Sequence, residues 1–203
     1  KTVISVKILN FNELPEYETM YLYYPDVLAG QVHNKITISK NGQFKFVLNL
    51  DNSTNAWIYY VANLPVFISK GDSLNIIIDN RFITNKAENY AELFGHLKVS
   101  GEKENMNKEV SEFLAFLEDS IYNHMALNDS LKILDPVPAR AFLENELQKQ
   151  YKILNQFNKQ KNTSIHFQNW ARNHLKYRTW SILFQYPAFH AYLNKLEKPK
   201  NGY

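Results

Sequence analysis

The spacing of hydrophobic residues changes once along the chain, near residue 101. Before that point apolar and polar side chains alternate in short runs, which is the period of a β-strand, and turn residues separate the runs. About eight such runs at intervals of eight to twelve residues are typical of an antiparallel β-sandwich. The predicted strands cover residues 2–9, 19–24, 31–39, 44–49, 56–62, 64–69, 74–79 and 96–101.

Turn residues support this division into strands. The pair Asn41-Gly42 lies between two apolar runs and is the strongest turn signal in the chain. In the segment 70–73, Gly71 tolerates a positive φ, and the side chains of Asp72 and Ser73 can bond nearby backbone groups. A strand is therefore expected to follow directly, with Leu74, Ile76 and Ile78 on one face.

After residue 101 apolar residues recur every three or four positions, which predicts helices. A first helix is expected to start near Asn105, a plausible cap, and to carry its apolar stripe as far as Met125. A second helix is expected from Asp135-Pro136, because proline is tolerated in a first helical turn.

A third helix is expected to begin near Thr163 or Ser164 and to reach about Gln185. The pair Tyr186-Pro187 is expected to interrupt it, and a short fourth helix would cover 188–196. The predicted fold class is thus α+β, with an N-terminal antiparallel β-sandwich at 1–101 and a small α-helical domain at 102–203.

Composition removes several classes of function. The 203 residues include 23 basic and 20 acidic side chains, a balance that does not suggest a nucleic-acid-binding surface. The nearest basic cluster, Lys195, Lys198 and Lys200, is interpreted as a solvated tail. No apolar run reaches the roughly 18–20 residues of a membrane span, and the absence of cysteine excludes thiol chemistry on this chain. Because the sequence starts at Lys1, it is expected to be a processed or trimmed form.

No residue is nominated as catalytic, cofactor-binding or metal-ligating. None of the six histidines lies three or four positions from another, and His166 and His174 are too far apart on one helix to share a metal ion. Glycines are isolated from one another, and no serine has a Gly-x-Ser-x-Gly setting. We therefore expect that the chain is not an enzyme and needs no cofactor.

Aromatic residues on the predicted strands allow two interpretations. Tyr21 and Tyr23 share one strand face, as do Trp57 and Tyr59. The favoured interpretation is that both faces of these strands are covered and the rings belong to the core. The alternative is a free-standing β-sandwich module that binds a glycan or a peptide through these four rings.

The third predicted helix is crowded with aromatic residues on more than one side. This suggests either a helix buried on several faces or one that meets a partner. The residues are Phe167, Trp170, Tyr177, Trp180, Phe184 and Tyr186.

The order of these segments resembles a known family. The segment 70–76, the strand 97–101 and the helices that follow look like the N-terminal region of TlpA-like thioredoxin-family disulfide reductases of Bacteroidetes. The segments 177–180 and 186–190 also resemble the helical part that precedes the thioredoxin domain in such proteins.

The resemblance implies a periplasmic or outer-envelope location, with a possible lipid anchor upstream. Redox chemistry would reside in a C-terminal thioredoxin-like domain, and this sequence lacks the Cys-x-x-Cys motif of that domain. The chain is therefore expected to be a non-catalytic accessory region that positions a redox domain or binds its partner. The expected partners are that thioredoxin-like domain or a second copy of the chain.

Overall fold

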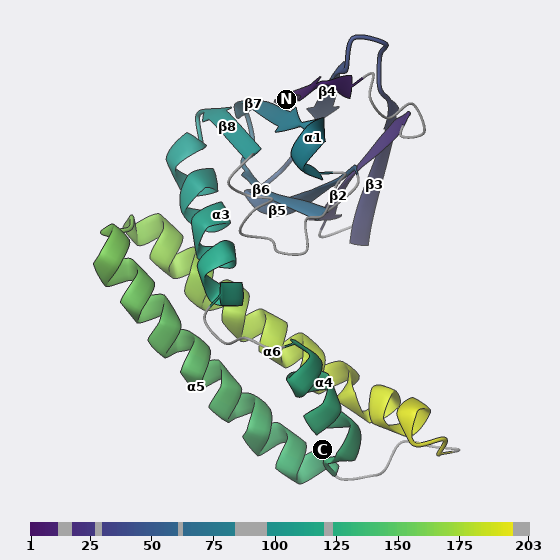
Figure 1. Ribbon diagram of the computed structural model, residues 1–203, viewed down its shortest axis with the longest axis vertical. Helices are drawn as coiled ribbons and strands as arrows, with labels where there is room; N and C mark the ends of the chain where they lie inside the picture. Colours follow the sequence, from purple (N-terminus) through teal and green to yellow (C-terminus); the bar gives the residue numbers. More distant parts are fainter. Residues whose placement is uncertain (12–17, 27–29, 61–62, 84–96, 120–123, 197–203) are drawn as a thin grey trace. The chain divides into compact units, whose positions relative to one another are not determined.

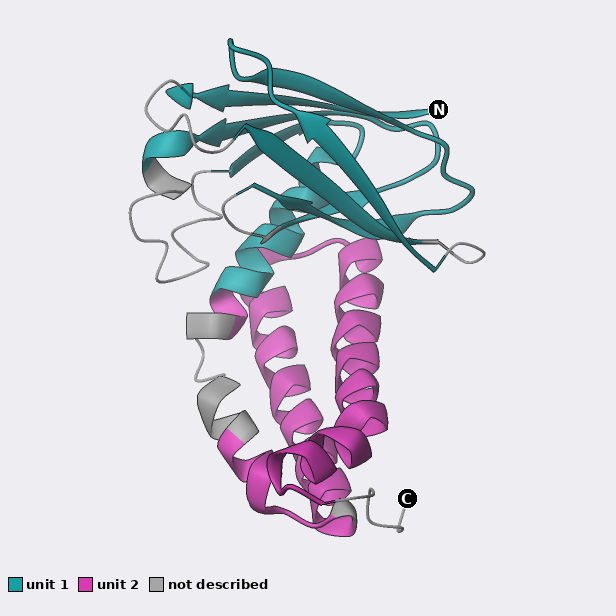
Figure 2. Ribbon diagram, turned by 90° about the vertical axis from the view of Figure 1, so that its right-hand side faces the viewer, with its two compact units in different colours: residues 1–115 teal, residues 116–203 magenta. Residues whose placement is uncertain are grey.

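The computed structural model describes residues 1–11, 18–26, 30–60, 63–83, 97–119 and 124–196. The chain forms two compact units, Lys1–Ala115 and Phe116–Tyr203, coloured separately in Figure 2. The first unit contains the strands and the second contains helices, which confirms the α+β class and the N-terminal β-sandwich. The division between the units falls within helix α3 (Glu104–Asp119).

The first unit is built from two sheets of four strands each (Figure 1). The first sheet has the order β4-β1-β7-β8 and the second has the order β3-β2-β5-β6. Among the described strands every pairing is antiparallel except β1 with β7, which is parallel. The strands are β1 (Thr2–Leu9), β2 (Thr19–Asp26), β3 (Gly30–Thr37), β4 (Gln43–Leu48), β5 (Thr54–Tyr59), β6 (Asn63–Ile68), β7 (Ser73–Asp79) and β8 (Leu97–Gly101).

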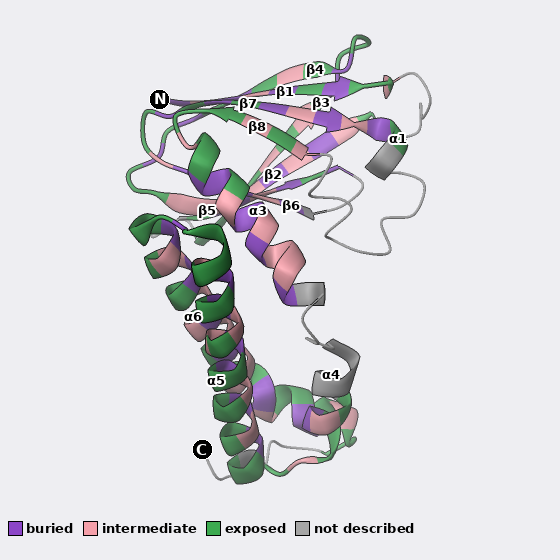
Figure 3. Cartoon of the chain, turned by 60° about the vertical axis from the view of Figure 1, so that its left-hand side comes forward, coloured by how far each residue is buried: buried purple, intermediate pink, exposed green. Residues whose placement is uncertain are grey.

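The alternation in the sequence places one face of each sheet in a shared core. On β7 the buried residues are Leu74, Ile76 and Ile78, as the pattern predicts, and the second sheet contributes Leu22 and Ile58. Figure 3 shows buried and exposed positions alternating along the strands. Of the predicted strand residues, positions 61, 62 and 96 lie outside the described ones.

Both predicted turns are confirmed. Gly42 and Gly71 have φ values of 69° and 88°, in the left-handed region that glycine adopts without strain. A carboxylate oxygen of Asp72 accepts the Ser69 backbone N–H at 2.7 Å. The Thr2 hydroxyl donates to the Ser69 carbonyl oxygen and accepts the Gly71 N–H, so the turn is tied to the start of β1.

One side chain of α3 completes the free edge of the second sheet. The edge strand β6 directs the backbone N–H and C=O of Phe67 away from β5, toward Asn107. Asn107 Oδ1 accepts the N–H at 2.8 Å, and its Nδ2 donates to the Phe67 carbonyl at 3.0 Å. The amide side chain thus takes the place of a neighbouring strand at this position.

The second unit is made of helices, with α5 (Pro136–Lys161) and α6 (Ile165–Leu193) lying side by side (Figure 1). The predicted starts are confirmed: Asp135 precedes a proline in the first turn of α5, and Ser164 caps α6 by accepting the Phe167 N–H. Asn162, with φ of 51°, ends α5.

The first predicted helix is wrong in two respects. Asn105 is not its cap, because α3 already includes Glu104. Met125 belongs to a separate helix, α4 (His124–Ile133). The helical spacing of apolar residues continues from α3 into α4. Spacing alone therefore cannot show where one amphipathic helix ends and the next begins.

The predicted interruption at Tyr186-Pro187 is also wrong, because α6 continues through Pro187 to Leu193. A proline removes one backbone hydrogen bond, and tertiary packing can outweigh that loss. Here Tyr186 is buried, and its hydroxyl has one proton to donate and lies within hydrogen-bonding distance of two carbonyl oxygens, those of Leu131 in α4 and of Leu134 just after it. This bond anchors the helix directly before the proline, and after it Asn194 Nδ2 donates to the Lys132 carbonyl oxygen at 3.1 Å.

Candidate binding surfaces

The outer face of the second sheet carries an aromatic group, which we call the sheet surface: Tyr21, Tyr23, Trp57 and Tyr59. These residues alternate with the buried ones on β2 and β5. Tyr59 is 41% exposed, and the other three rings are partly exposed. Assigning these rings to the core was therefore wrong, since the core lies on the opposite face of both strands.

Strand pairing brings the rings of the sheet surface together. Tyr21 is the register partner of Tyr59, and Tyr23 is the partner of Trp57. The centroids of Tyr21 and Tyr23 are 6.0 Å apart with an 11° angle between the planes, and Tyr21 and Tyr59 are 6.4 Å apart. The group is continuous across the two strands, and cross-strand contacts of this kind stabilise a sheet.

The neighbouring strand β3 adds polar groups to the sheet surface. His33 meets Tyr23 edge to face at 4.7 Å, and Lys35 Nζ lies 5.7 Å from the centre of the Tyr21 ring. His33 and Lys35 share one face of β3, and the register of β3 with β2 places each of them opposite a tyrosine. Rings bordered by an imidazole and an ammonium group can stack on a flat ligand and also bond its polar groups.

A second exposed aromatic group lies on α6, and we call it the α6 surface: Tyr177, Trp180, Phe184 and Tyr192. Their exposed fractions are 61%, 51%, 89% and 81%. They point away from the side of the helix that carries the buried Leu175, Thr179 and Tyr186. The sequence therefore indicated correctly that aromatic residues occupy more than one side of this helix.

The sequence reasoning missed Tyr192, because it assigned that residue to a separate helix. The signal was the four-residue spacing of 180, 184, 188 and 192, which continues across Pro187. In the middle of this row Ala188 is exposed and small.

The charged side chains of α6 itself are all basic. From Ile165 to Leu193 the helix contains no acidic residue. Lys176 Nζ lies 4.5 Å from the centre of the Trp180 ring, close enough for a cation–π interaction. Tyr177 meets Trp180 edge to face at 6.1 Å.

Of the remaining aromatic residues of α6, Phe189 is 39% exposed and the others lie toward the inside of the second unit. Phe167 is fully buried and contacts Phe157 of α5 at 5.7 Å between centroids. Trp170 stacks on His174 at 4.9 Å and 17°. Burial, assisted by the positive charge of Arg178, lowers the pKa of His174 to about 4.

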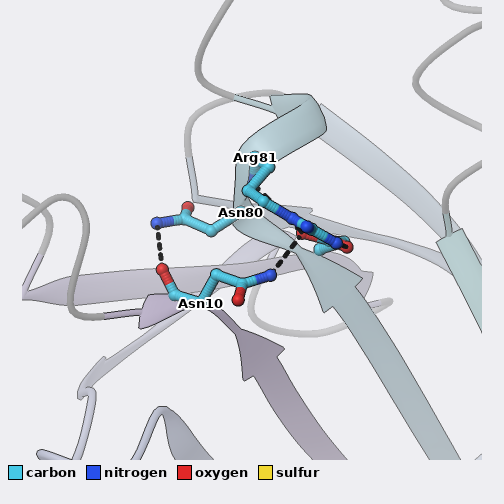
Figure 4. A network of polar contacts seen from close by, with 4 residues as sticks. Asn10, Asn80 and Arg81 are labelled. Carbon is cyan, nitrogen blue, oxygen red and sulfur yellow. Dashed lines mark hydrogen bonds and ion pairs between the residues drawn. The ribbon is translucent and has the colours of Figure 1, made fainter.

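A polar network joins the ends of the parallel strands β1 and β7 (Figure 4). Asn10, with φ of 56°, donates to Asp79 at 3.0 Å, and Asn80 donates to the Asn10 carbonyl oxygen at 3.4 Å. Arg81, in the short helix α1 (Asn80–Ile83), donates to both carboxylate oxygens of Asp79. These bonds hold the Asp79 pKa well below its usual range, and they give the network a structural role.

Within the described ranges, no three histidine or carboxylate side chains gather as a metal site would require. The chain likewise has no described helix both long and apolar enough to cross a bilayer. No family model, curated protein or solved structure matches this chain.

Proposed function

We propose that the chain is a non-catalytic accessory region of a cell-envelope thioredoxin-like protein, and that it binds a protein partner through the α6 surface. The observation that carries the partner-binding part is the row of exposed rings on α6, with Phe184 at 89% exposure. Contiguous apolar surface of this kind marks interaction sites in proteins. The resemblance of segments 70–76, 97–101, 177–180 and 186–190 supports the envelope and thioredoxin part.

In this proposal the two units have different roles. The sandwich supplies a stable body, and the second unit presents the α6 surface on a rigid helix that is anchored to its neighbours. Removing the exposed rings from water would drive association, at ~25 cal/mol for each Å² of apolar surface buried. The partner is a thioredoxin-like domain of the same protein or a second copy of the chain.

The family part is tested by the coding sequence downstream of Tyr203. We expect the reading frame to continue for roughly one domain, about 100–150 residues, and to encode Trp-Cys-x-x-Cys. A stop codon directly after Tyr203 would remove the link to a thioredoxin-like protein.

The partner-binding part is tested by the accessibility of Trp180. Replacing Trp57 and Trp170 by phenylalanine leaves Trp180 as the sole tryptophan of this chain's three. If the frame continues, any tryptophan in the added domain is replaced in the same way. Quenching of Trp180 by acrylamide, a neutral quencher that the charge at residue 184 does not repel, is then measured in the natural gene product. We expect it to be weaker than in a Phe184→Glu variant, because a bound partner shields the ring.

A second candidate function is supported by the sheet surface. The exposure of Tyr59, beside three partly exposed rings, favours a module that binds a glycan or a peptide by stacking. A screen of soluble glycans and extended peptides that follows Trp57 fluorescence tests this function. Binding that is lost in Tyr59→Ala and kept in Phe184→Ala would support it, whereas binding unaffected by Tyr59→Ala would exclude the sheet surface.

A further inference from the structure

We infer that the occupant of the α6 surface is a second copy of this chain, whose α6 packs against it in the antiparallel direction with a two-fold axis beside Phe184. This inference rests on the proposed partner-binding function and adds the identity, direction and register of the partner. It is argued from the shape, area and charge of the α6 surface.

The α6 surface is complementary to itself about Phe184. Residues four apart form a ridge on a helix, and here the ridge is Trp180, Phe184, Ala188 and Tyr192. Ala188 leaves a gap in this ridge between two large rings. Trp180 and Ala188 lie equally far from Phe184, so a two-fold axis there brings Trp180 of each copy to the gap at Ala188 of the other. An isologous interface requires this kind of match.

The exposed area suits a dimer. A fully exposed aromatic side chain presents roughly 200 Å², so the four exposed fractions amount to about 560 Å² on each copy. Stable interfaces bury about 1,200–2,000 Å² in total, counted over both partners. The aromatic rings of two copies alone therefore provide nearly the lower bound, before the smaller side chains between them are counted.

Charge selects the antiparallel direction. In a parallel pair Lys176 would lie beside its own equivalent, and no acidic residue of α6 could compensate. In the antiparallel pair the two Lys176 side chains are about 24 Å apart along the axis, well beyond the screening length of about 10 Å. Each then lies level with Tyr192 of the other copy, in the last turn of that helix, where the helix dipole favours a cation.

Sedimentation equilibrium of the chain tests the association. We expect a reversible dimer, and Phe184→Glu should raise its dissociation constant about 30-fold or more, because a carboxylate would be buried at the centre of the interface. Ile165→Glu is the matched control. Ile165 is also an exposed apolar residue of α6, at 62%, and it lies outside the α6 surface, so this variant should dimerise normally. Equal effects of the two variants, or a chain that stays monomeric at high concentration, would overturn the inference.

Disulfide cross-linking tests direction and register, and the cysteine-free sequence makes it specific. Ser181→Cys and Ala188→Cys change two exposed small residues and leave every aromatic ring in place. In the antiparallel pair residue 181 of one copy lies level with residue 187 of the other. The two copies of residue 181 are about 9 Å apart along the helix axis, and the two copies of residue 188 are about 12 Å apart. Both separations are too long for a disulfide. A mixture of the two variants should therefore cross-link faster than either alone. If either variant alone cross-linked faster than the mixture, the helices would be parallel and the inference would be refuted.

The two proposals fail in different ways. A monomeric chain whose Trp180 is nevertheless shielded in the natural gene product would overturn the second copy as partner and leave partner binding intact. Trp180 quenching equal to that of the Phe184→Glu variant, in the natural gene product at high concentration, would overturn both.

Discussion

Asn107 offers the sharpest test of how α3 is attached to the sandwich. Its side chain is 1% exposed and makes three hydrogen bonds, with both backbone groups of Phe67 and with the Lys103 carbonyl oxygen. The change Asn107→Ala removes all three and leaves the Phe67 N–H and C=O on the edge of the sheet without this partner.

The expected cost follows from these bonds. Each buried backbone group left without a partner costs about 1–3 kcal/mol. Water can enter the space vacated by the amide and recover part of that loss, so Asn107→Ala should lower the free energy of unfolding of the first unit by about 2–4 kcal/mol. The control Asn105→Ala changes an exposed asparagine on the same helix and should stay within about 0.5 kcal/mol of the original.

The most local assay is hydrogen exchange at the Phe67 amide, followed by NMR. In the unaltered chain this N–H should be protected, although β6 is an edge strand. In Asn107→Ala it should exchange much faster, while the amides of the central strand β1 should remain much better protected than the Phe67 amide. A Phe67 amide that exchanges freely in the unaltered chain would refute the edge-completing role of Asn107.

Three further changes have defined outcomes. Tyr186→Phe removes the hydroxyl that faces two carbonyl oxygens at the end of α4. The free energy of unfolding of the second unit, measured in urea, should fall by about 1–3 kcal/mol. An unchanged free energy of unfolding would contradict the anchoring of α6 through Pro187. Gly101→Ala should destabilise the sandwich by about 1–3 kcal/mol, because φ of Gly101 is 116° and a Cβ there would lie 2.2 Å from the Ser73 carbonyl oxygen. An unchanged midpoint of urea unfolding would show that β8 can shift to make room for the methyl group. His174 stays neutral in the fold down to about pH 4, whereas in the unfolded chain it takes up a proton near pH 6.5, so stability should fall as the pH drops through that range. In His174→Gln this fall should be smaller, by at most about 1.4 kcal/mol per pH unit, when both proteins are unfolded in urea at a series of pH values.

Local sequence signals were sufficient for most of the elements. Alternation fixed which residues of β7 face the core, and Asp135 with its following proline marked the start of α5. Ser164 marked the start of α6 in the same way. These signals act within a few residues, so a single sequence contains them in full.

The features that could not be predicted depend on contacts between distant residues. The continuation of α6 through Pro187 depends on a bond from Tyr186 to a carbonyl 55 residues earlier. The parallel pairing of β1 with β7 joins residues about seventy positions apart, and its polar connection through Asn10 and Asp79 is equally distant. Rules for proline and for strands use only neighbouring residues of the sequence, so they cannot predict such contacts.

For a related reason, the sequence predicted which elements carry aromatic residues but not which of these residues are exposed. Aromatic residues on α6 were expected on more than one side, and the structure separates them into a core set and the α6 surface. Which side is covered depends on where α4 and α5 pack. For the strands the same ambiguity led to the wrong choice, because an aromatic row on a sheet has the same sequence pattern whether it faces the core or solvent.

The most direct test of partner binding through α6 is quenching by neutral acrylamide of Trp180 as the sole tryptophan in the natural gene product. We expect the quenching constant to be clearly lower than in the Phe184→Glu variant, and to rise to that value on dilution if the partner is a second copy. Quenching that is equally strong in both proteins at every concentration would contradict the assignment of the α6 surface as a binding site.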